Sequence, residues 1–199
     1  MMDFFERLTP FSPSPERKEI LMPLVAHIRQ LQQENKAVQL NFICTHNSRR
    51  SQLSQLLAKV MAEHYSIEIE TFSGGVEVTA CNERVIHCLE SLGFSIQTAG
   101  EKNNPHYTIG WGSNVFSVLF SKMYDDPTNP KENYVAVMTC DHADKNCPFI
   151  PGADLRIPIR YTDPKAFDDT ADEGKAYLNK ALEIGQEMKF VFEQLSQKK

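Results

Sequence analysis

The fold of this chain is decided by one stretch, VQLNFICTHNSRRSQLSQLLAKVM, at positions 38–61. Positions 38–43 are mostly apolar and predict a short buried strand, whereas positions 53–61 predict a helix with one apolar face. A polar loop, CTHNSRRS, lies between them at positions 44–51. In parallel α/β sheets, ligands bind where a strand gives way to a helix, so this loop is the first candidate for a functional site. The apolar face of the expected helix consists of Leu53, Leu56, Leu57, Val60 and Met61.

The rest of the chain alternates between strand-like and helix-like segments in the same way. Further strands are expected at 67–72, 134–138 and 155–159, where apolar residues are continuous or alternate with polar ones. Apolar residues recur at helical spacing at 85–92 and again from about 172 to the C-terminus. Strands that alternate with helices predict an α/β fold, with a parallel sheet that carries helices on both faces.

Two segments lie outside this alternation. Segment 1–36 contains Ser14-Pro15, an N-cap followed by a proline at the first helical position, and predicts an amphipathic helix ahead of the main domain at 37–199. Positions 103–133 are rich in proline and glycine around an alternating apolar run, which predicts an inserted strand or hairpin. Aromatic residues of this insertion either cover the site or pack the added strand, and we expect packing for Tyr107, Trp111 and Phe116.

Composition narrows the function classes. The chain has 199 residues, of which 41% are hydrophobic and 24% charged, and a net charge of −5, which is ordinary for a globular domain. It has no basic field or Lys/Arg-rich run, and no apolar run approaches the roughly 20 residues that cross a bilayer. We therefore expect no nucleic-acid partner and no membrane partner. The N-terminus lacks the basic-then-apolar order of a secretory signal, which favours a cytoplasmic protein.

The five cysteines are an odd number and argue against a structural disulfide framework. Cysteines in a reducing compartment are core residues, metal ligands or reactive thiols, and their positions decide which. Cys81 and Cys88 lie in a segment with helical periodicity and are expected to fill the core. Cys44, Cys140 and Cys147 fall at strand ends or in polar sequence, where a thiol can react.

The loop at 44–51 has the spacing C-x5-R followed by serine, which suits a nucleophilic thiol beside an oxyanion. Backbone N–H groups of a tight strand-to-helix loop point inward and bind anions, and the helix N-terminus adds positive potential. That potential favours the thiolate of Cys44, while Arg50 offers a planar fork to two oxygens of a tetrahedral oxyanion. Ser51 is placed to hydrogen-bond the sulfur, and Asn47 to brace the loop from inside. The simpler alternative is a buried strand-end cysteine followed by a surface arginine.

Residues 41–52, NFICTHNSRRSQ, resemble the active-site loop of the low-molecular-weight protein tyrosine phosphatase superfamily. Within that superfamily, the thioredoxin-coupled arsenate reductases share the pattern C-T-x-N-S-x-R-S-Q, and the resemblance extends over roughly 38–169. It implies a parallel four-stranded sheet flanked by helices, with Cys44 as the nucleophile and Arg50 as an oxyanion ligand. The other residues of the expected oxyanion-binding loop are Thr45, His46, Asn47, Ser48, Arg49 and Ser51.

Two positions depart from the reductase pattern. His46 replaces the usual glycine in the loop. Gln55 stands where the reductases often carry a glutamate that helps to bind potassium, so no metal site is assigned. The helix before position 38 and the insertion at 103–133 also lie outside the pattern that the superfamily shares.

A second cysteine pair occurs in the sequence CDHADKNC at positions 140–147. Core cysteines or half of a metal site are the alternatives, although zinc normally needs a second ligand pair and only His142 is near. The polar residues between the cysteines predict an exposed, mobile loop. The resemblance to the reductases implies a thiol relay, in which Cys140 attacks the Cys44 sulfur and Cys147 then attacks Cys140.

Protonation of a leaving oxygen requires an acid near the loop, and Asp163-Pro164 is the expected source. An ordinary Asp-Pro turn is the alternative, but the resemblance implies that such a loop after the last strand carries the general acid. Asp168 and Asp169 are second choices. The two residues that follow Pro164 are not aromatic, which favours a small inorganic anion over a phenol ring as substrate.

The expected function is the reduction of arsenate to arsenite, with thioredoxin or a similar thiol reductant as partner and no cofactor on the chain. The alternative is a phosphatase that uses the same nucleophile, arginine and acid, in which Cys140 and Cys147 give only redox protection. A third possibility, an oxyanion-binding or redox-sensing module without catalysis, needs no acid, so the presence of Asp163 argues against it. The sequence leaves the reductant and the oligomeric state open.

Overall fold

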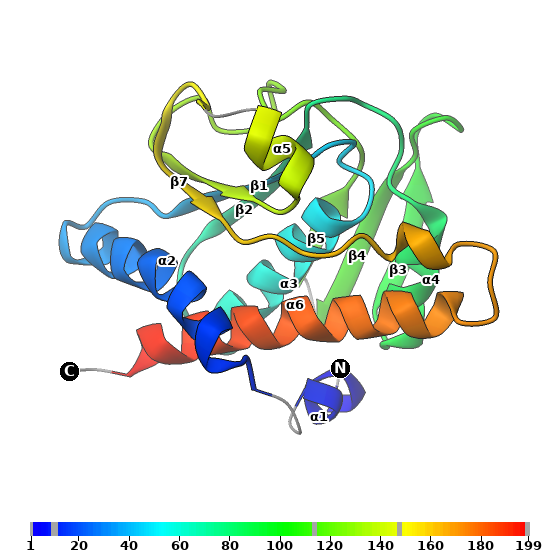
Figure 1. The fold of residues 1–199 in the computed structure, drawn as a ribbon, viewed down its shortest axis with the longest axis horizontal. Coiled ribbons are helices and arrows are strands. Elements are labelled where there is room, and N and C mark those ends of the chain that lie inside the picture. Colours follow the sequence, from blue (N-terminus) through cyan, green and yellow to red (C-terminus); the bar gives the residue numbers. More distant parts are fainter. Residues whose placement is uncertain (1, 9–11, 113–114, 147–148, 198–199) are drawn as a thin grey trace.

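The computed structural model describes residues 2–8, 12–112, 115–146 and 149–197. Its main sheet is parallel, with the strand order β2-β1-β6-β7 (Figure 1). This arrangement confirms the parallel four-stranded sheet that the sequence predicts. The strands are β1 (Gln39–Cys44), β2 (Glu70–Gly75), β6 (Tyr134–Met138) and β7 (Ala153–Pro158).

Long helices cover one face of this sheet. The strands alternate between two cores, since Leu40 and Phe42 of β1 belong to the large core that the long helices share, whereas Ile43 belongs to a smaller cluster with Ala143. On that second face the layer is thin and consists of the short helix α5 (Asp141–Asn146) and loops. The helices that share the large core are α2 (Pro15–Gln33), α3 (Arg50–His64), α4 (Glu83–Ser91) and α6 (Glu173–Ser196).

The N-terminal segment belongs to the same core rather than to a separate unit. Helix α1 (Met2–Leu8) places Phe4 and Leu8 against Gly185 of α6, where an added Cβ would lie 3.1 Å from both side chains. Helix α2 begins at the expected cap, where Ser14 Oγ accepts from the Arg17 backbone N–H, and the helix continues through its internal proline. None of the helices in the described ranges is both long enough and apolar enough to cross a membrane.

A second sheet is antiparallel, with the order β3-β4-β5. Strands β4 (His106–Gly112) and β5 (Val115–Leu119) form the hairpin predicted for the insertion, whereas β3 (Ser95–Ala99) is not evident from the sequence. Tyr107 and Trp111 pack against the large core, and Phe116 is 60% exposed.

The predicted position of β2 is wrong by several residues. The sequence suggests a strand at 67–72 that ends at Ser73-Gly74-Gly75, but these three residues belong to the strand. A Cβ at Gly74 would lie 2.2 Å from the Tyr124 Cα, so the glycine is needed for close packing of two backbones and not for a turn.

Candidate active site

The anion loop (residues 44–51) joins β1 to α3. Cys44 ends β1, Arg50 begins α3, and the thiol is buried at 3% exposure. Among the described residues, no backbone N–H from positions 45–49 donates a hydrogen bond to another part of the backbone. Backbone donors at a helix N-terminus that have no protein acceptor are suited to bind an anion.

A directed chain of hydrogen bonds ends at the sulfur. The Lys122 backbone N–H donates to Asn47 Oδ1 (3.0 Å), which fixes the amide so that Asn47 Nδ2 donates to Ser51 Oγ (2.8 Å). The hydroxyl of Ser51 lies 3.1 Å from Cys44 Sγ. Because that hydroxyl already accepts from Asn47, its own hydrogen is free to point at the sulfur, where it stabilises a thiolate. Asn47 reaches this position with a left-handed backbone, at φ 46°.

The brace segment (residues 120–124), which follows β5 of the inserted hairpin, contacts the anion loop from outside. Ser121 Oγ donates to the His46 carbonyl (2.8 Å), and Gln52 Nε2 bridges the carbonyls of Asn47 and Phe120 (2.7 and 2.8 Å). The sequence gives no sign of these contacts, because the partners lie far apart along the chain.

Lys122 brings a buried ammonium to the same region. The residue is 5% exposed, and its Nζ lies 4.2 Å from the centre of the Phe120 ring. Burial lowers the pKa of Lys122 to about 8, although the charge of Asp126 acts in the opposite direction. Burial also raises the pKa of Cys81 and of Cys88 to about 12, so both thiols are protonated at neutral pH, as core cysteines are expected to be.

Arg50 and Asp163 meet beside the anion loop. Arg50 Nη2 donates to Asp163 Oδ2 (2.6 Å), and Nη1 donates to the Tyr161 carbonyl (3.2 Å). Arg50 Nε is buried without a hydrogen-bond partner among the described residues. A buried guanidinium donor without an acceptor is costly, and it gains a partner when an oxyanion binds. Asp163 also caps the short 3-10 helix η1 (Pro164–Phe167), where Oδ1 accepts from the Lys165 N–H.

The other loop side chains point in separate directions. Ser48 Oγ donates to the Ala80 carbonyl, and His46 Nε2 lies 3.1 Å from Glu77 Oε2 at the surface. Arg49 donates to Asp168 Oδ2 (2.8 Å), so its guanidinium pairs with the segment behind Asp163. These residues are therefore expected to serve an oxyanion through their backbone N–H groups.

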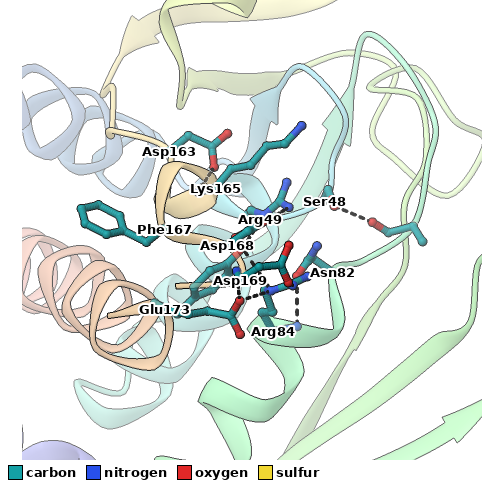
Figure 2. A network of polar contacts seen from close by, with 12 residues as sticks. Ser48, Arg49, Asn82, Arg84, Asp163, Lys165, Phe167, Asp168, Asp169 and Glu173 are labelled. Carbon is teal, nitrogen blue, oxygen red and sulfur yellow. Dashed lines mark hydrogen bonds and ion pairs between the residues drawn. The ribbon is translucent and has the colours of Figure 1, made fainter. Parts of the chain in front are cut away.

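The two second-choice acids belong to an ion-pair network. Figure 2 shows Arg49, Asp168, Asp169, Arg84 and Glu173 gathered between the anion loop and the first turn of α6. Their carboxylates pair with Arg49 and Arg84, whereas the carboxylate of Asp163 pairs with Arg50, the arginine expected from the sequence to bind the oxyanion.

Cys140 follows β6 and lies next to the anion loop. Its Sγ is 3.5 Å from Thr45 Oγ1, accepts from the Ala143 N–H (3.3 Å) and is 1% exposed. Cys44 and Cys140 belong to the same small apolar cluster on the second face of the sheet. Two thiols that are remote in the sequence are thus brought together at adjacent strand ends.

Cys147, the last member of the expected relay, lies outside the described residues. The helix before it, α5, is anchored by Arg156, which donates to Asp144 Oδ1 (2.5 Å), and by Arg160, which donates to Asp141 Oδ1 (2.8 Å). The residues between the cysteines therefore form a short, mostly exposed helix rather than the irregular loop that the sequence predicts.

Gln55 is committed to contacts within the protein. Its Nε2 donates to Ser117 Oγ and to the Val118 carbonyl (both 3.2 Å), and its Oε1 accepts from Ser73 Oγ (2.6 Å). Across the described ranges, no group of three or more His, Cys, Asp or Glu side chains is arranged to hold a metal ion.

Comparison with known proteins identifies relatives by sequence. No protein-family model matches the chain. Arsenate reductase 2 of Staphylococcus epidermidis (strain RP62A) is 27% identical over 124 residues, which cover 62% of this chain and 76% of that protein. An arsenate reductase of Staphylococcus aureus (strain bovine RF122) is 31% identical over 111 residues, which cover 55% of this chain and 66% of that protein.

Solved structures share the fold at lower identity. A YwlE mutant from Bacillus subtilis aligns with a TM-score of 0.55 and 13% identity, covering 81% of this chain and 100% of that one. The arsenate reductase of Archaeoglobus fulgidus aligns with a TM-score of 0.50 and 20% identity, covering 77% and 98%. A low-molecular-weight phosphotyrosine phosphatase from Vibrio cholerae aligns with a TM-score of 0.51 and 12% identity, covering 78% and 94%. The chain is therefore a distant homologue of the staphylococcal arsenate reductases, with the fold of the low-molecular-weight phosphatases.

Proposed function

We propose that this chain reduces arsenate to arsenite by a cysteine relay and is regenerated by thioredoxin or a similar dithiol reductant. The observation that supports this most is the second thiol: Cys140 Sγ lies 3.5 Å from Thr45 Oγ1, directly beside the Cys44 loop. A hydrolase needs one thiol at this place, whereas a reductase needs a second thiol to supply electrons. The homology to arsenate reductases agrees with that choice.

In the first step, arsenate binds to the free N–H groups of the anion loop, and Arg50 turns its fork from Asp163 to the oxyanion. The Cys44 thiolate attacks arsenic and forms an S–As bond. Asp163, released from the arginine, takes up a proton from the bound arsenate or from solvent and passes it to the departing hydroxide, which leaves as water. Arsenic is still in its oxidised state after this step.

In the second step, the Cys140 thiolate attacks the Cys44 sulfur and forms a Cys44–Cys140 disulfide. The electron pair of the broken S–As bond stays on arsenic, which leaves as arsenite after proton uptake. Cys147 then attacks the Cys140 sulfur, so Cys44 is released as a thiolate and a Cys140–Cys147 disulfide forms. The dithiol reductant returns this disulfide to two thiols and completes the cycle.

The rival function is hydrolysis of phosphate monoesters with Cys44, Arg50 and Asp163 alone. The observation in its favour is that Cys140 is 1% exposed beneath α5, so its sulfur cannot pass a disulfide to a partner unless that short helix moves. Phosphate and arsenate have the same geometry and charge, so a low phosphatase activity is compatible with the reductase as well.

The decisive test follows arsenate-dependent NADPH oxidation with thioredoxin and thioredoxin reductase. Wild type is expected to turn over many times. Cys140→Ser stops at the Cys44–arsenic adduct, and Cys147→Ser stops after one arsenite is released, at the Cys44–Cys140 disulfide. Cys88→Ala, which removes a buried thiol from α4, serves as the matched control and keeps its turnover. If neither serine variant lowers turnover, or if arsenate is inert while p-nitrophenyl phosphate is hydrolysed, the chain is a phosphatase.

A further inference from the structure

Two adjacent arginines leave the anion loop in different directions. Arg50 pairs with Asp163 and has an unused buried donor, so it is suited to bind the oxyanion. Arg49 has no free donor of that kind: its Nε donates to Tyr177 Oη (2.6 Å) and its Nη2 to Asp168 Oδ2 (2.8 Å). The two guanidinium groups therefore hold two points of the same acid loop (residues 161–172).

Arg49, Tyr177 and Asp168 form three mutual hydrogen bonds. The Tyr177 hydroxyl accepts from Arg49 and donates to Asp168 Oδ1 (2.7 Å), so all three side chains are joined pairwise. Burial and the hydrogen bond to Asp168 raise the pKa of Tyr177, which keeps the hydroxyl protonated. The side chains of Arg49 and Asp168 are only 13% and 16% exposed, so water screens this ion pair little.

A second arginine extends the anchor to α4 and α6. Arg84 Nε donates to Glu173 Oε2 and its Nη2 to Asp169 Oδ1, each at 2.6 Å. Asp169 has a left-handed backbone (φ 62°), and its own N–H donates to Glu173 Oε2 (2.7 Å). The far end of the acid loop is thus fixed in a tight turn (Figure 2).

The near end of the acid loop is held more weakly. Between Asp163 and Asp168 lies one 3-10 turn, in which Pro164 is buried and Phe167 is 46% exposed. The side chain of Asp163 is tied to Arg50, and an oxyanion that takes the fork of Arg50 removes that tie. At that moment, the anchor at Asp168 keeps the turn that carries the acid in place.

We infer that Arg49 is a positioning residue, which holds Asp163 in reach of the bound oxyanion after Arg50 has released it. This inference rests on the proposed function, in which Asp163 is the general acid. Neighbouring loop positions thereby divide the work: Arg50 binds the substrate, and Arg49 holds the proton donor.

A double-mutant cycle tests this role through arsenate turnover. Arg49→Met is expected to lower kcat about 10- to 100-fold with little change in KM, because general acids contribute on the order of 10²–10⁴ to the rate. In an Asp163→Asn background, the same change is expected to cost less than about two-fold, since no proton donor is left to position. Arg49→Lys restores part of kcat. Arg29→Met is the matched control, since this half-buried arginine joins α2 to α6 through the Gln194 carbonyl, and it leaves kcat unchanged.

If the two substitutions act independently, the double variant loses kcat by the product of the two single effects. That result would overturn the inference and leave the proposed function intact. Full activity of Asp163→Asn would overturn both. A second measurement needs no turnover: amide hydrogen exchange of residues 165–170 in the presence of phosphate. Arg49→Met is expected to raise exchange there at least several-fold while wild type and Arg29→Met stay protected, and equal protection in all three overturns the inference. If Arg49→Met does not fold, Asp168→Asn replaces it in both experiments.

Discussion

The anion loop and the relay segment (residues 140–146) are neighbours on the sheet, yet they are held by different forces. The loop is fixed by hydrogen bonds from Ser121 and Lys122 and from Gln52 of α3, and its backbone is in close contact with β2 at Gly75. In the relay segment, Ala143 alone is buried among residues 141–145. Arginine ion pairs attach the segment: the pair between Arg156 and Asp144 is half-buried, and the pair between Arg160 and Asp141 is exposed.

The difference follows from what each region has to do in the proposed reaction. Binding and attack on an oxyanion require donors and a sulfur in fixed positions, which a satisfied buried network provides. Passing a disulfide from Cys44 through Cys140 to Cys147 requires the chain around Cys140 to move. Exposed ion pairs are suited to that, because each contributes little to stability and is easily exchanged for water.

Gly75→Ala tests whether the anion loop is rigid, and it has the largest expected effect on catalysis. An added Cβ would lie 2.7 Å from the Asn47 N and 2.8 Å from the Thr45 carbonyl, so the anion loop must shift. Displacements of this kind reduce catalysis about 100-fold or more and cost about 1–3 kcal/mol of stability. The control is Gly174→Ala, where the new methyl meets nothing within 4 Å. Equal kcat/KM in both variants would show that the loop is not rigid.

Lys122→Met tests whether the ammonium beside the anion loop is buried, through the pH dependence of stability. The unfolded chain keeps its proton up to the ordinary pKa of 10.5, whereas the folded lysine loses it near 8, so the unfolded state binds more protons between these values. Stability of wild type relative to Lys122→Met is therefore expected to rise with pH across this window, by up to about 3 kcal/mol at 1.36 kcal/mol per unit. Urea unfolding at pH 7, 8.5 and 10 measures the difference. A difference that stays constant or falls with pH contradicts the burial of the ammonium.

Arg160→Met tests how loosely α5 of the relay segment is held, and it has the smallest expected effect of the three substitutions. Its side chain is 46% exposed and pairs with Asp141, which is 68% exposed. Amide exchange at residues 141–145 is expected to accelerate only about two- to five-fold at low salt, and the difference from wild type should vanish near 1 M salt. Arg29→Met again serves as control. A salt-independent loss of protection would mean that α5 is held by packing instead.

Local patterns in the sequence predict the sheet and the centre of the site. The apolar spacing of 38–43 and 53–61 gives β1 and α3, and the C-x5-R spacing places Cys44 and Arg50 at their junction because all the information is local. Strand β3 is missed because four of its five residues are exposed, so no apolar face marks it in the sequence, and its pairing with β4 defines it.

The supporting residues of the site could not be found in this way. Ser121 and Lys122 meet the anion loop from a segment that looks like an ordinary loop, and Tyr177 joins Arg49 from a helix near the C-terminus. No periodicity or spacing relates residues so far apart, because their contacts are set by the way the elements pack. The role of Arg49 is equally hidden, since the sequence shows a basic residue and not the direction in which it points.

The contact between Ser121 and His46 has a consequence for how this site can vary. The hydroxyl of Ser121 holds the carbonyl of residue 46, and any amino acid supplies that carbonyl. A change of the side chain at position 46 leaves this contact intact, whereas loss of the hydroxyl at position 121 removes the 2.8 Å bond and leaves the longer one from Thr79 Oγ1 (3.3 Å). A residue of the anion loop itself therefore tolerates substitution better than the residue that supports it from a distant part of the chain.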